Sequence, residues 1–339
     1  MGKEPLFISV ANQKGGAGKT TYTILLASYL CYRKGYNVLV VDSDFPQGSF
    51  FKLRQRELSL LDQSQWHKVQ LVKQFRQCGK KAYPILSTQP ECAVTIASEF
   101  LKHDPRQFDL VFYDLPGTLN TTGVFYTLST LDYLFVPMKA DRIVMESTIT
   151  YAKIIQEQLI RPGKTNLKGI FLFWTLIDGR ERTELYTQYE KVLDALGLQK
   201  LSTRIPARSK FSKELQAGIN AVYRSTILAP DTAFTADCRL DALADEILSR
   251  IPDSGKYIDV KVNGSNIQIP FQEIIYAEHF SHMIHIHTAG ERELITRQSF
   301  DSFITSLKMD SRFYQCNRGV VINLEHAVDF DGSIFRLDN

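Results

Sequence analysis

A glycine-rich run near the N-terminus separates an apolar segment from a helical one, and it limits the folds open to this chain. Residues 12–21 read Asn-Gln-Lys-Gly-Gly-Ala-Gly-Lys-Thr-Thr, between the β-branched residues at 6–10 and a stretch with helical apolar spacing at 20–33. Glycines allow consecutive backbone N–H groups to point inward, and the N-terminus of the next helix adds a positive dipole end. This order of strand, loop and helix predicts a phosphate-binding site in an α/β sheet.

The side chains of this loop predict contacts with a nucleoside triphosphate and its metal ion. We expect Lys19 to reach the β and γ phosphates and the Thr20 hydroxyl to ligate Mg²⁺. The pattern departs from GxxxxGK[ST] because Gln13 replaces the first glycine and Lys14 stands at the loop entrance. The alternative, a tight turn that binds nothing, is disfavoured by the length of the match. The other expected nucleotide contacts are Gly15, Gly16, Ala17, Gly18 and Thr21.

The run Lys-Gly-Gly-Ala-Gly-Lys-Thr-Thr at 14–21 resembles the deviant phosphate loop, or Walker A motif, of the ParA and MinD ATPases. In that family the first lysine reaches across a dimer interface to the partner's nucleotide, so the resemblance implies that Lys14 acts in trans. It also implies ATP and Mg²⁺ as cofactors, slow ATP hydrolysis, and an ATP-dependent homodimer.

Apolar segments alternate with helical patterns along the first 250 residues. The segments at 6–10, 38–41, 110–113, 133–136 and 167–173 have the composition of buried parallel strands. Residues 20–33, 145–159 and 241–250 have helical apolar spacing. The sequence therefore predicts a P-loop NTPase fold, with a doubly wound, mostly parallel sheet and helices on both faces.

Three aspartates follow predicted strands, where open α/β sheets place their ligands. Asp44 resembles the family's switch aspartate, which orients the attacking water, and the resemblance assigns catalysis to it together with Lys14 and Lys19. Asp42 is expected to support the metal or the loop, and Asp114 resembles the Walker B residue that holds Mg²⁺ through water. Phe45 interrupts the family's DxDPQ pattern, which leaves plain helix capping as an alternative for Asp44.

Two later segments resemble the adenine-binding parts of the same family. Thr175 lies in a run that resembles a strand end near the base, and Pro206 in one that resembles a base-contacting loop. The alternative is that both segments are ordinary loops. The resemblance covers residues 6 to about 250, and within it residues 240–248 resemble TraA-like proteins of mobile conjugative elements.

Charge is distributed unevenly between the two parts of the chain. Residues 257–339 hold 7 of the 40 Lys and Arg but 11 of the 37 Asp and Glu, which leaves that part at −4 and the first 256 residues at +7. ParA-type dimers bind DNA through a basic face, so the resemblance suggests this role for one group of residues, with a solvated surface as the alternative. The group comprises Arg204, Arg208, Lys210 and Lys213.

The apolar period changes from helical spacing to two after residue 256. Turn formers at 251–255 predict a boundary, with an ATPase domain at 1–251, a linker at 252–256 and a mostly β domain at 257–339. Residues 274–278, 280–282 and 313–323 resemble a LytTR DNA-binding domain, one that ends before the family's terminal strand. The resemblance assigns DNA contacts to His282, Arg297, Asn317 and Arg318.

Two metal or cross-link interpretations of the sequence are weak. His279, His282, His285 and His287 invite a metal site, but solvent-facing histidines on a strand explain the spacing as well. Five separated cysteines without a CxxC pair argue against a disulfide framework or a zinc ribbon.

Three functions are compatible with these motifs. The first is an ATPase that positions a plasmid or a conjugative-transfer complex on DNA, with a ParB-like or transfer-apparatus protein as its activator. The second is a transcription regulator whose LytTR-like domain reads DNA under control of the ATPase. The third, a biosynthetic ATPase of the same superfamily, is disfavoured by the lack of a substrate domain. No apolar run spans a bilayer, so we expect a cytoplasmic protein that is associated with the nucleoid when ATP is bound.

Overall fold

The computed structural model describes residues 4–119, 121–178, 183–251, 257–262, 264–290, 292–308, 310, 312–330 and 334–337. The chain divides into two compact units, and the break between them falls after residue 252. The expected linker at 252–256 lies outside the described residues. None of the helices in these ranges combines the length and the hydropathy that a bilayer span needs.

Seven strands form one sheet in the first unit, and every neighbouring pair runs parallel. Their spatial order is β3-β2-β4-β1-β5-β6-β7. The chain passes from β1 out to β2 and β3, returns to place β4 between β1 and β2, and then adds β5, β6 and β7 on the other side of β1. This arrangement confirms the predicted doubly wound P-loop fold. The strands are β1 (Leu6–Val10), β2 (Val38–Asp42), β3 (Ile85–Ser87), β4 (Leu110–Asp114), β5 (Tyr133–Met138), β6 (Gly169–Ile177) and β7 (Gln199–Pro206).

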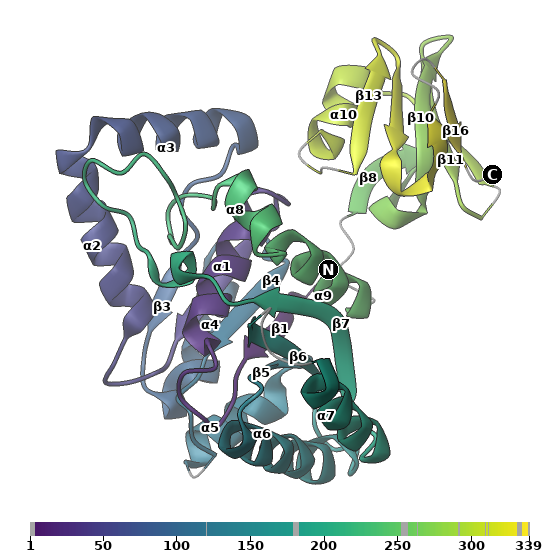
Figure 1. Cartoon of the computed structure of the whole chain (residues 1–339). Helices are drawn as coiled ribbons and strands as arrows, with labels where there is room; N and C mark the ends of the chain where they lie inside the picture. The colour runs from purple at the N-terminus through teal and green to yellow at the C-terminus, as the bar shows by residue number, and fades with distance from the viewer. Residues whose placement is uncertain are drawn as a thin grey trace. The chain divides into compact units, whose positions relative to one another are not determined.

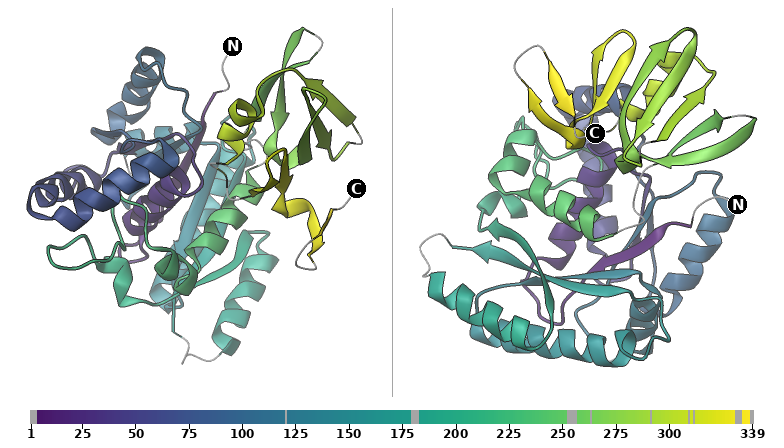
Figure 2. Two further views of the ribbon diagram at one scale, coloured as in Figure 1. Left: turned by 90° about the horizontal axis from the view of Figure 1, so that it is seen from above. Right: turned by 90° about the vertical axis from the view of Figure 1, so that its right-hand side faces the viewer.

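Helices cover both faces of this sheet (Figures 1 and 2). Alternate strand residues explain why, since Val40 packs into one core while Val41 packs into the other. The first core is closed by α1 (Lys19–Tyr32), α8 (Thr232–Asp237) and α9 (Leu240–Arg250). The second is closed by α4 (Ala93–His103), α5 (Thr122–Thr130), α6 (Arg142–Ile155) and α7 (Thr183–Ala195). The helix expected at 145–159 ends in a π-helical turn, Gln156–Ile160.

A helical hairpin that the sequence patterns did not predict extends from the first unit (Figure 1). It consists of α2 (Ser49–Gln63) and α3 (Gln65–Cys78), which pack against an irregular segment at 213–231. Leu215 and Ile227 of that segment form a small separate core with Trp66 of the hairpin. The hairpin is also tied down by Glu57, whose buried carboxylate accepts a 2.9 Å hydrogen bond from the Thr226 amide.

The structure corrects the expected loop at 203–206. These residues form the end of β7, which pairs with β6 at the edge of the sheet, with Ile177 opposite Pro206. The strand expected at 167–173 likewise begins at Gly169 and continues to Ile177. Both segments have enough apolar and β-branched residues to extend the sheet, and their resemblance to loops concealed that tendency.

The second unit is mostly β, with a five-stranded antiparallel sheet in the order β12-β11-β10-β14-β13. Its core is formed by the strands and the helix α10, and includes Ile284, Ile286 and Phe303. The elements are β8 (Tyr257–Val262), β9 (Ser265–Pro270), β10 (Ile274–Phe280), β11 (Met283–Thr288), β12 (Arg292–Thr296), α10 (Phe300–Leu307), β13 (Phe313–Asn317), β14 (Val320–Asn323), β15 (Ala327–Phe330) and β16 (Phe335–Leu337). Short 3-10 turns lie at Pro90–Cys92, Ser209–Ser212, Phe271–Glu273 and Leu324–His326.

The apolar period of two expected after residue 256 is interrupted in β10. The pairing of β10 with β11 shifts register between Ile274 and Tyr276, so Ile274 is buried whereas Tyr276 stacks on His287, with ring centroids 4.1 Å apart. A bulge of this kind exchanges the faces to which later side chains point.

Candidate functional site

Strand order brings the glycine-rich loop and two of the expected aspartates together. The loop follows β1, whose neighbour β4 ends in Asp114, and the next strand β2 ends in Asp42. Asp42 and Asp114 are partners in the register of the parallel pair β2 and β4. All three features therefore lie at the carboxyl edge of the sheet, where α/β folds bind ligands.

The backbone of the loop adopts the conformation for which its glycines are needed. Gly16 and Gly18 have φ of 79° and 92°, values that other residues rarely adopt. At Gly18 a Cβ atom would also lie 2.6 Å from the Tyr22 ring. Gly15, Gly16 and Lys14 are exposed, which leaves the mouth of the loop open to solvent.

Lys19 folds back over this loop, and its Nζ lies 3.3 Å from the Lys14 carbonyl oxygen. Burial lowers the pKa of Lys19, while the carboxylates of Asp114 and Asp44 oppose that shift. An ammonium group close to the loop and to two carboxylates is placed to accept a phosphate as a further anionic partner. Thr21 is held from another side by Arg224, whose Nη1 donates to its hydroxyl at 3.1 Å.

Thr20 and Asp114 form a direct pair, with the Thr20 hydroxyl donating to Oδ2 at 2.9 Å. Burial and the neighbouring Asp42 raise the pKa of Asp114 to about 8, and the hydrogen bond from Thr20 opposes the shift. The Asp114 carboxyl group is therefore buried at the end of an apolar strand, where a bound cation would stabilise its charged form.

Asp42 supplies a second oxygen group. Its Oδ2 accepts a 3.1 Å hydrogen bond from the Phe51 amide at the start of α2, whereas Oδ1 is buried without a hydrogen-bond partner in the described part of the chain. An orphaned carboxylate oxygen beside Thr20 and Asp114 fits Mg²⁺, which prefers hard oxygen ligands and retains several waters. The residues present therefore suit the metal that a triphosphate brings with it.

Asp44 lies two residues beyond β2 and is partly exposed. Burial raises the pKa of its carboxyl group and Lys19 opposes that shift, so the two side chains sense one another. The intervening Phe45 is 59% exposed and contributes no core contact. Asp44 is thus partly exposed and close enough to Lys19 for the two charges to interact, and its expected role toward water stays a prediction.

The expected adenine contacts occupy different positions. Thr175 is fully buried, and its hydroxyl donates to the Met138 carbonyl at 3.1 Å and lies 3.3 Å from the Ala17 carbonyl. The Thr175 side chain supports the glycine-rich loop from behind. Because this side chain is buried and hydrogen-bonded, it is not exposed for the expected contact with the base. Pro206 is the last residue of β7 and is partly exposed at the carboxyl edge of the sheet.

Sequence reasoning missed two residues that shape the site. The buried Asn12 donates from Nδ2 to the Pro137 carbonyl and the Thr148 hydroxyl, each at 2.8 Å, and so fixes the loop entrance. Gly117 faces the loop from the segment after β4, where a Cβ would lie 3.0 Å from Lys19 Nζ and 3.1 Å from the Gln13 oxygen. Its place three residues after Asp114 was the only available signal in the sequence.

Replacing Gly117 by alanine is expected to displace Lys19 and weaken nucleotide binding. Crowding of this kind costs about 1–3 kcal/mol, which corresponds to a loss of about 5- to 150-fold in affinity. Calorimetric titration with an ATP analogue measures the effect. Gly290→Ala is the matched control because a Cβ there meets nothing within 4 Å. Equal affinities for the two variants would contradict the prediction.

Half of the expected basic face is neutralised in the structure. Arg204 pairs with Glu190 at 2.7 Å, and Arg208 pairs with Asp237 at 3.1 Å. Lys210 lies 5.6 Å from the centroid of the Tyr223 ring, and Lys213 is exposed. The four residues therefore form a weaker positive surface than the sequence predicts.

The four expected DNA contacts of the second unit gather at one end of its sheet. His282 lies in the turn between β10 and β11, Asn317 is the last residue of β13, and Arg318 begins the turn between β13 and β14. Pairing of β10 with β14 joins these turns, as the 2.7 Å hydrogen bond from the His279 amide to the Gly319 oxygen shows. Arg297 directly follows β12, which pairs with the start of β11 through Thr296 and Ile284.

These four side chains differ in their surroundings. All are exposed, but Asn317 uses its Oδ1 to accept a 2.8 Å hydrogen bond from the Gly319 amide and thus stabilises the turn. His282 has φ of 66°, which defines the tight hairpin tip. Arg318 lies in the turn that directly follows Asn317, and its expected contact with DNA stays a prediction.

The histidine cluster does not form a metal site. His285 pairs with Glu293 at 2.6 Å, and His287 lies 3.5 Å from Glu278. No group of three or more His, Cys, Asp or Glu in the described ranges is arranged to hold a metal ion. As expected, the alternating Ile284 and Ile286 are buried on the opposite face.

The parallel sheet, the loop after β1 and the carboxylates at the ends of β2 and β4 define an ATP-hydrolysing P-loop protein. Residues 8–221 match the CobQ/CobB/MinD/ParA nucleotide binding domain, and the chain belongs to this family. Residues 264–334 match the LytTR DNA-binding domain, which identifies the second unit. Both resemblances found in the sequence are thereby confirmed.

Individual proteins are similar to the first unit. The chromosome-partitioning ATPase Soj of Thermus thermophilus is 28% identical over 265 residues, which are 73% of this chain and 97% of Soj. A putative plasmid partition protein from Borrelia burgdorferi, solved with AMPPNP, is 18% identical with a TM-score of 0.47, covering 73% of this chain and 100% of that one. Cobyrinic acid a,c-diamide synthase from Mycobacterium smegmatis, solved with an ATP analog and magnesium, is 22% identical with a TM-score of 0.45, covering 73% and 95%.

Proposed function

We propose that this protein is an ATP-dependent dimerising ATPase that binds DNA and positions or partitions a plasmid or a conjugative-transfer complex. The name of its relative Soj, a chromosome-partitioning ATPase, supports a partition role. An activator protein of the ParB kind, or part of a transfer apparatus, would stimulate hydrolysis and release. In its ATP-bound form the protein would be associated with the nucleoid.

The observation that carries this proposal is the pair of lysines at the glycine-rich loop. Lys19 folds over the loop and approaches Asp114 and Asp44, whereas Lys14 is exposed at the loop entrance. In the proposed arrangement Lys19 would hold the phosphates of its own chain, while the exposed Lys14 would remain available to a second copy. An exposed lysine beside a nucleotide is placed to reach the nucleotide of a second copy.

The proposed chemistry assigns separate tasks to the residues of the site. Backbone amides of the loop and Lys19 would hold the phosphates, and Thr20, Asp42 and Asp114 would hold Mg²⁺ directly or through water. The bound metal would neutralise charge that develops on the transferred phosphoryl group. Asp44 would orient the attacking water and receive its proton, and Thr175 would keep the loop in place from behind.

Replacing Lys14 by alanine tests the role across the dimer. We expect ATP to bind with an affinity within about threefold of wild type, because Lys14 is exposed. Turnover is expected to fall by about 10-fold or more and to lose its dependence on protein concentration, since the partner's charge is missing. Turnover assays with and without duplex DNA, combined with light scattering in AMPPNP, measure both effects.

The control for this test is Lys153→Ala, which removes an exposed lysine from α6. It should leave turnover and the dimer unchanged. A Lys14→Ala protein that still dimerises and hydrolyses ATP like wild type would exclude the action in trans, although the loop could still bind ATP.

A second function is favoured by the gathering of the four expected DNA contacts at one end of the LytTR sheet. In this second function the protein would be a transcription regulator. ATP would control its dimer state, and the residues at this end of the LytTR sheet would set its sequence preference. Footprinting on a repeat pair, with and without ATP, distinguishes regulation from sequence-independent positioning.

Arg318→Ala is expected to weaken binding to a preferred sequence by about 10- to 100-fold, because one bidentate guanine contact contributes about 1–3 kcal/mol. Competition between specific and random duplexes at fixed salt measures the loss. Lys261→Ala on β8 is the control, since it also removes one exposed cation from this unit. If both variants lose the same amount, the arginine acts only through charge.

A further inference from the structure

A cavity of about 520 Å³ lies at the edge of the sheet opposite to the phosphate loop. Val38, which lines it, is the first residue of β2, and Pro84 directly precedes β3. The glycine-rich loop follows the other end of β1, and all these strands are parallel. Cavities of roughly 300–1,000 Å³ accept small molecules, so this volume suits a ligand separate from the triphosphate.

The walls of this cavity carry positive charge and no carboxylate. Lys80, Lys81 and Arg106 line it, and Lys80 Nζ donates a hydrogen bond to the neutral amide oxygen of Asn37. Arg106 has a counter-charge in Asp104 at 2.7 Å. Among the described residues no ion pair joins Lys80 or Lys81 to a carboxylate, and Asp109, which is not part of the lining, accepts a 2.6 Å hydrogen bond from the Asn37 amide.

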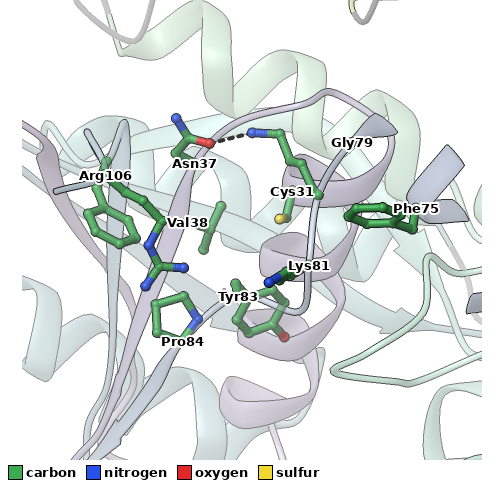
Figure 3. Close-up of a pocket in the computed structure, with 11 residues that line it drawn as sticks. Cys31, Asn37, Val38, Phe75, Gly79, Lys81, Tyr83, Pro84 and Arg106 are labelled. Carbon is green, nitrogen blue, oxygen red and sulfur yellow. Dashed lines mark hydrogen bonds between the residues drawn. The ribbon is translucent and has the colours of Figure 1, made fainter. Parts of the chain in front are cut away.

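Aromatic rings provide the other walls. Phe75, Tyr83 and Phe108 line the same cavity, and Phe75, which is 47% exposed, is the ring open to a ligand, because Tyr83 and Phe108 are buried. The Arg106 guanidinium lies 5.3 Å from the centroid of the Phe108 ring, which holds it against the wall. Figure 3 shows Lys81 and Arg106 on opposite sides of the space, with Pro84 and Tyr83 between them.

The positive charges and the aromatic rings of the cavity lining determine which class of ligand fits. Metal ions are repelled by the lysines, and a purely apolar ligand would leave their charges without a partner. A phosphate satisfies the cations, and a base that stacks on an aromatic ring gains about 1–3 kcal/mol. We propose that this cavity binds a small phosphorylated molecule that carries an aromatic ring, of which a mononucleotide is the simplest example.

The cavity is mechanically connected to the phosphate loop through Tyr83. The Tyr83 hydroxyl is 3.1 Å from the Ser28 hydroxyl on α1, the helix that begins at Lys19. Arg54 of α2 contacts Tyr83 as well, with Nη2 donating to its carbonyl oxygen at 3.1 Å. A ligand that packs against Tyr83 therefore touches a residue bound to both helices that flank the triphosphate site.

Calorimetric titration of the full chain with guanosine 5′-monophosphate tests the proposal, with the phosphate loop first saturated with AMPPNP and Mg²⁺. We expect binding that the double variant Lys80→Gln/Lys81→Gln weakens by about 10-fold or more. Lys153→Gln, which removes an exposed lysine of α6, should change affinity by less than about twofold. Thermal melts establish that the surface variants remain folded.

Each contrary outcome overturns a stated part of the proposal. No binding to wild type, equal binding to the double variant, or binding abolished by AMPPNP would remove the cavity as a site. Inorganic phosphate that binds as tightly as the nucleotide would show that the rings contribute nothing. Linkage is reciprocal, so an AMPPNP affinity that is the same with and without the mononucleotide would exclude the connection through Tyr83. A chain that fails to bind AMPPNP would refute the proposed ATPase function, while the lysine dependence would still test the cavity.

Discussion

Replacing Lys19 by alanine is expected to weaken ATP binding by about 100-fold or more and to reduce hydrolysis below detection. With a bound nucleotide, Lys19 and the phosphates would form a desolvated charge pair, and truncating one partner of such a pair costs about 2–5 kcal/mol. Lys19 is the cation that lies over the loop and opposes the carboxylates of Asp114 and Asp44. Without it a polyanionic nucleotide would meet an uncompensated acidic pocket. Titration calorimetry with AMPPNP and Mg²⁺ measures affinity, and phosphate release measures turnover.

The control for Lys19→Ala is Lys153→Ala, a removal of charge far along the chain in α6. It should match wild type in both assays. We expect the Lys19 variant to fold, because Lys19 lies at the start of α1 rather than in the core. Circular dichroism and a thermal melt check this. A folded Lys19→Ala protein that binds AMPPNP like wild type would refute the phosphate-loop interpretation.

Much of the first fold was predictable because its signals are local. The strands at 6–10 and 38–41 are short, mostly apolar runs, as strands covered on both faces require. By contrast, the hairpin of α2 and α3 rests on an irregular segment at 213–231 that lies far away in sequence. The apolar pattern of neither segment predicts the contact between the α2–α3 hairpin and residues 213–231.

The site was predictable to the extent that strand ends define it. Asp42 and Asp114 were expected beside the loop because parallel strands end at one edge, and their register shows that they are neighbours. The role of Thr175 was not visible, since only packing shows that its hydroxyl turns under Ala17. Gly117 also gave little signal, because its importance lies in the space that Lys19 occupies.

The cavity lined by Lys80, Lys81 and Arg106 could not be predicted from the sequence, because its lining residues are far apart along the chain. Its walls come from Cys31, from Asn37, from residues 75–84 and from Arg106, which no motif connects. In the second unit, the bulge at Ile274 and Tyr276 similarly depends on pairing with β11. Motifs can be found in a sequence because their residues are close together in the chain. Cavities and bulges depend on contacts between residues that are far apart in the chain, so the sequence does not show them.

Replacing Asp44 by alanine is expected to separate hydrolysis from binding. Loss of a residue that positions and deprotonates water lowers turnover by about 10²- to 10⁴-fold. Asp44 is partly exposed and its carboxylate does not pair with Thr20, so AMPPNP affinity should stay within about threefold of wild type. Single-turnover phosphate release and calorimetry on the same preparation measure the two quantities.

This separation is what distinguishes Asp44 from Asp42 and Asp114. Those two carboxylates lie at the strand ends where Mg²⁺ fits, so their loss should weaken nucleotide binding as well as turnover. Asp62→Ala on α2, an aspartate that is 88% exposed, controls for the simple removal of a negative charge. Turnover by Asp44→Ala that equals wild type would instead make Asp44 a helix-capping residue, and would leave the water to be oriented by another group.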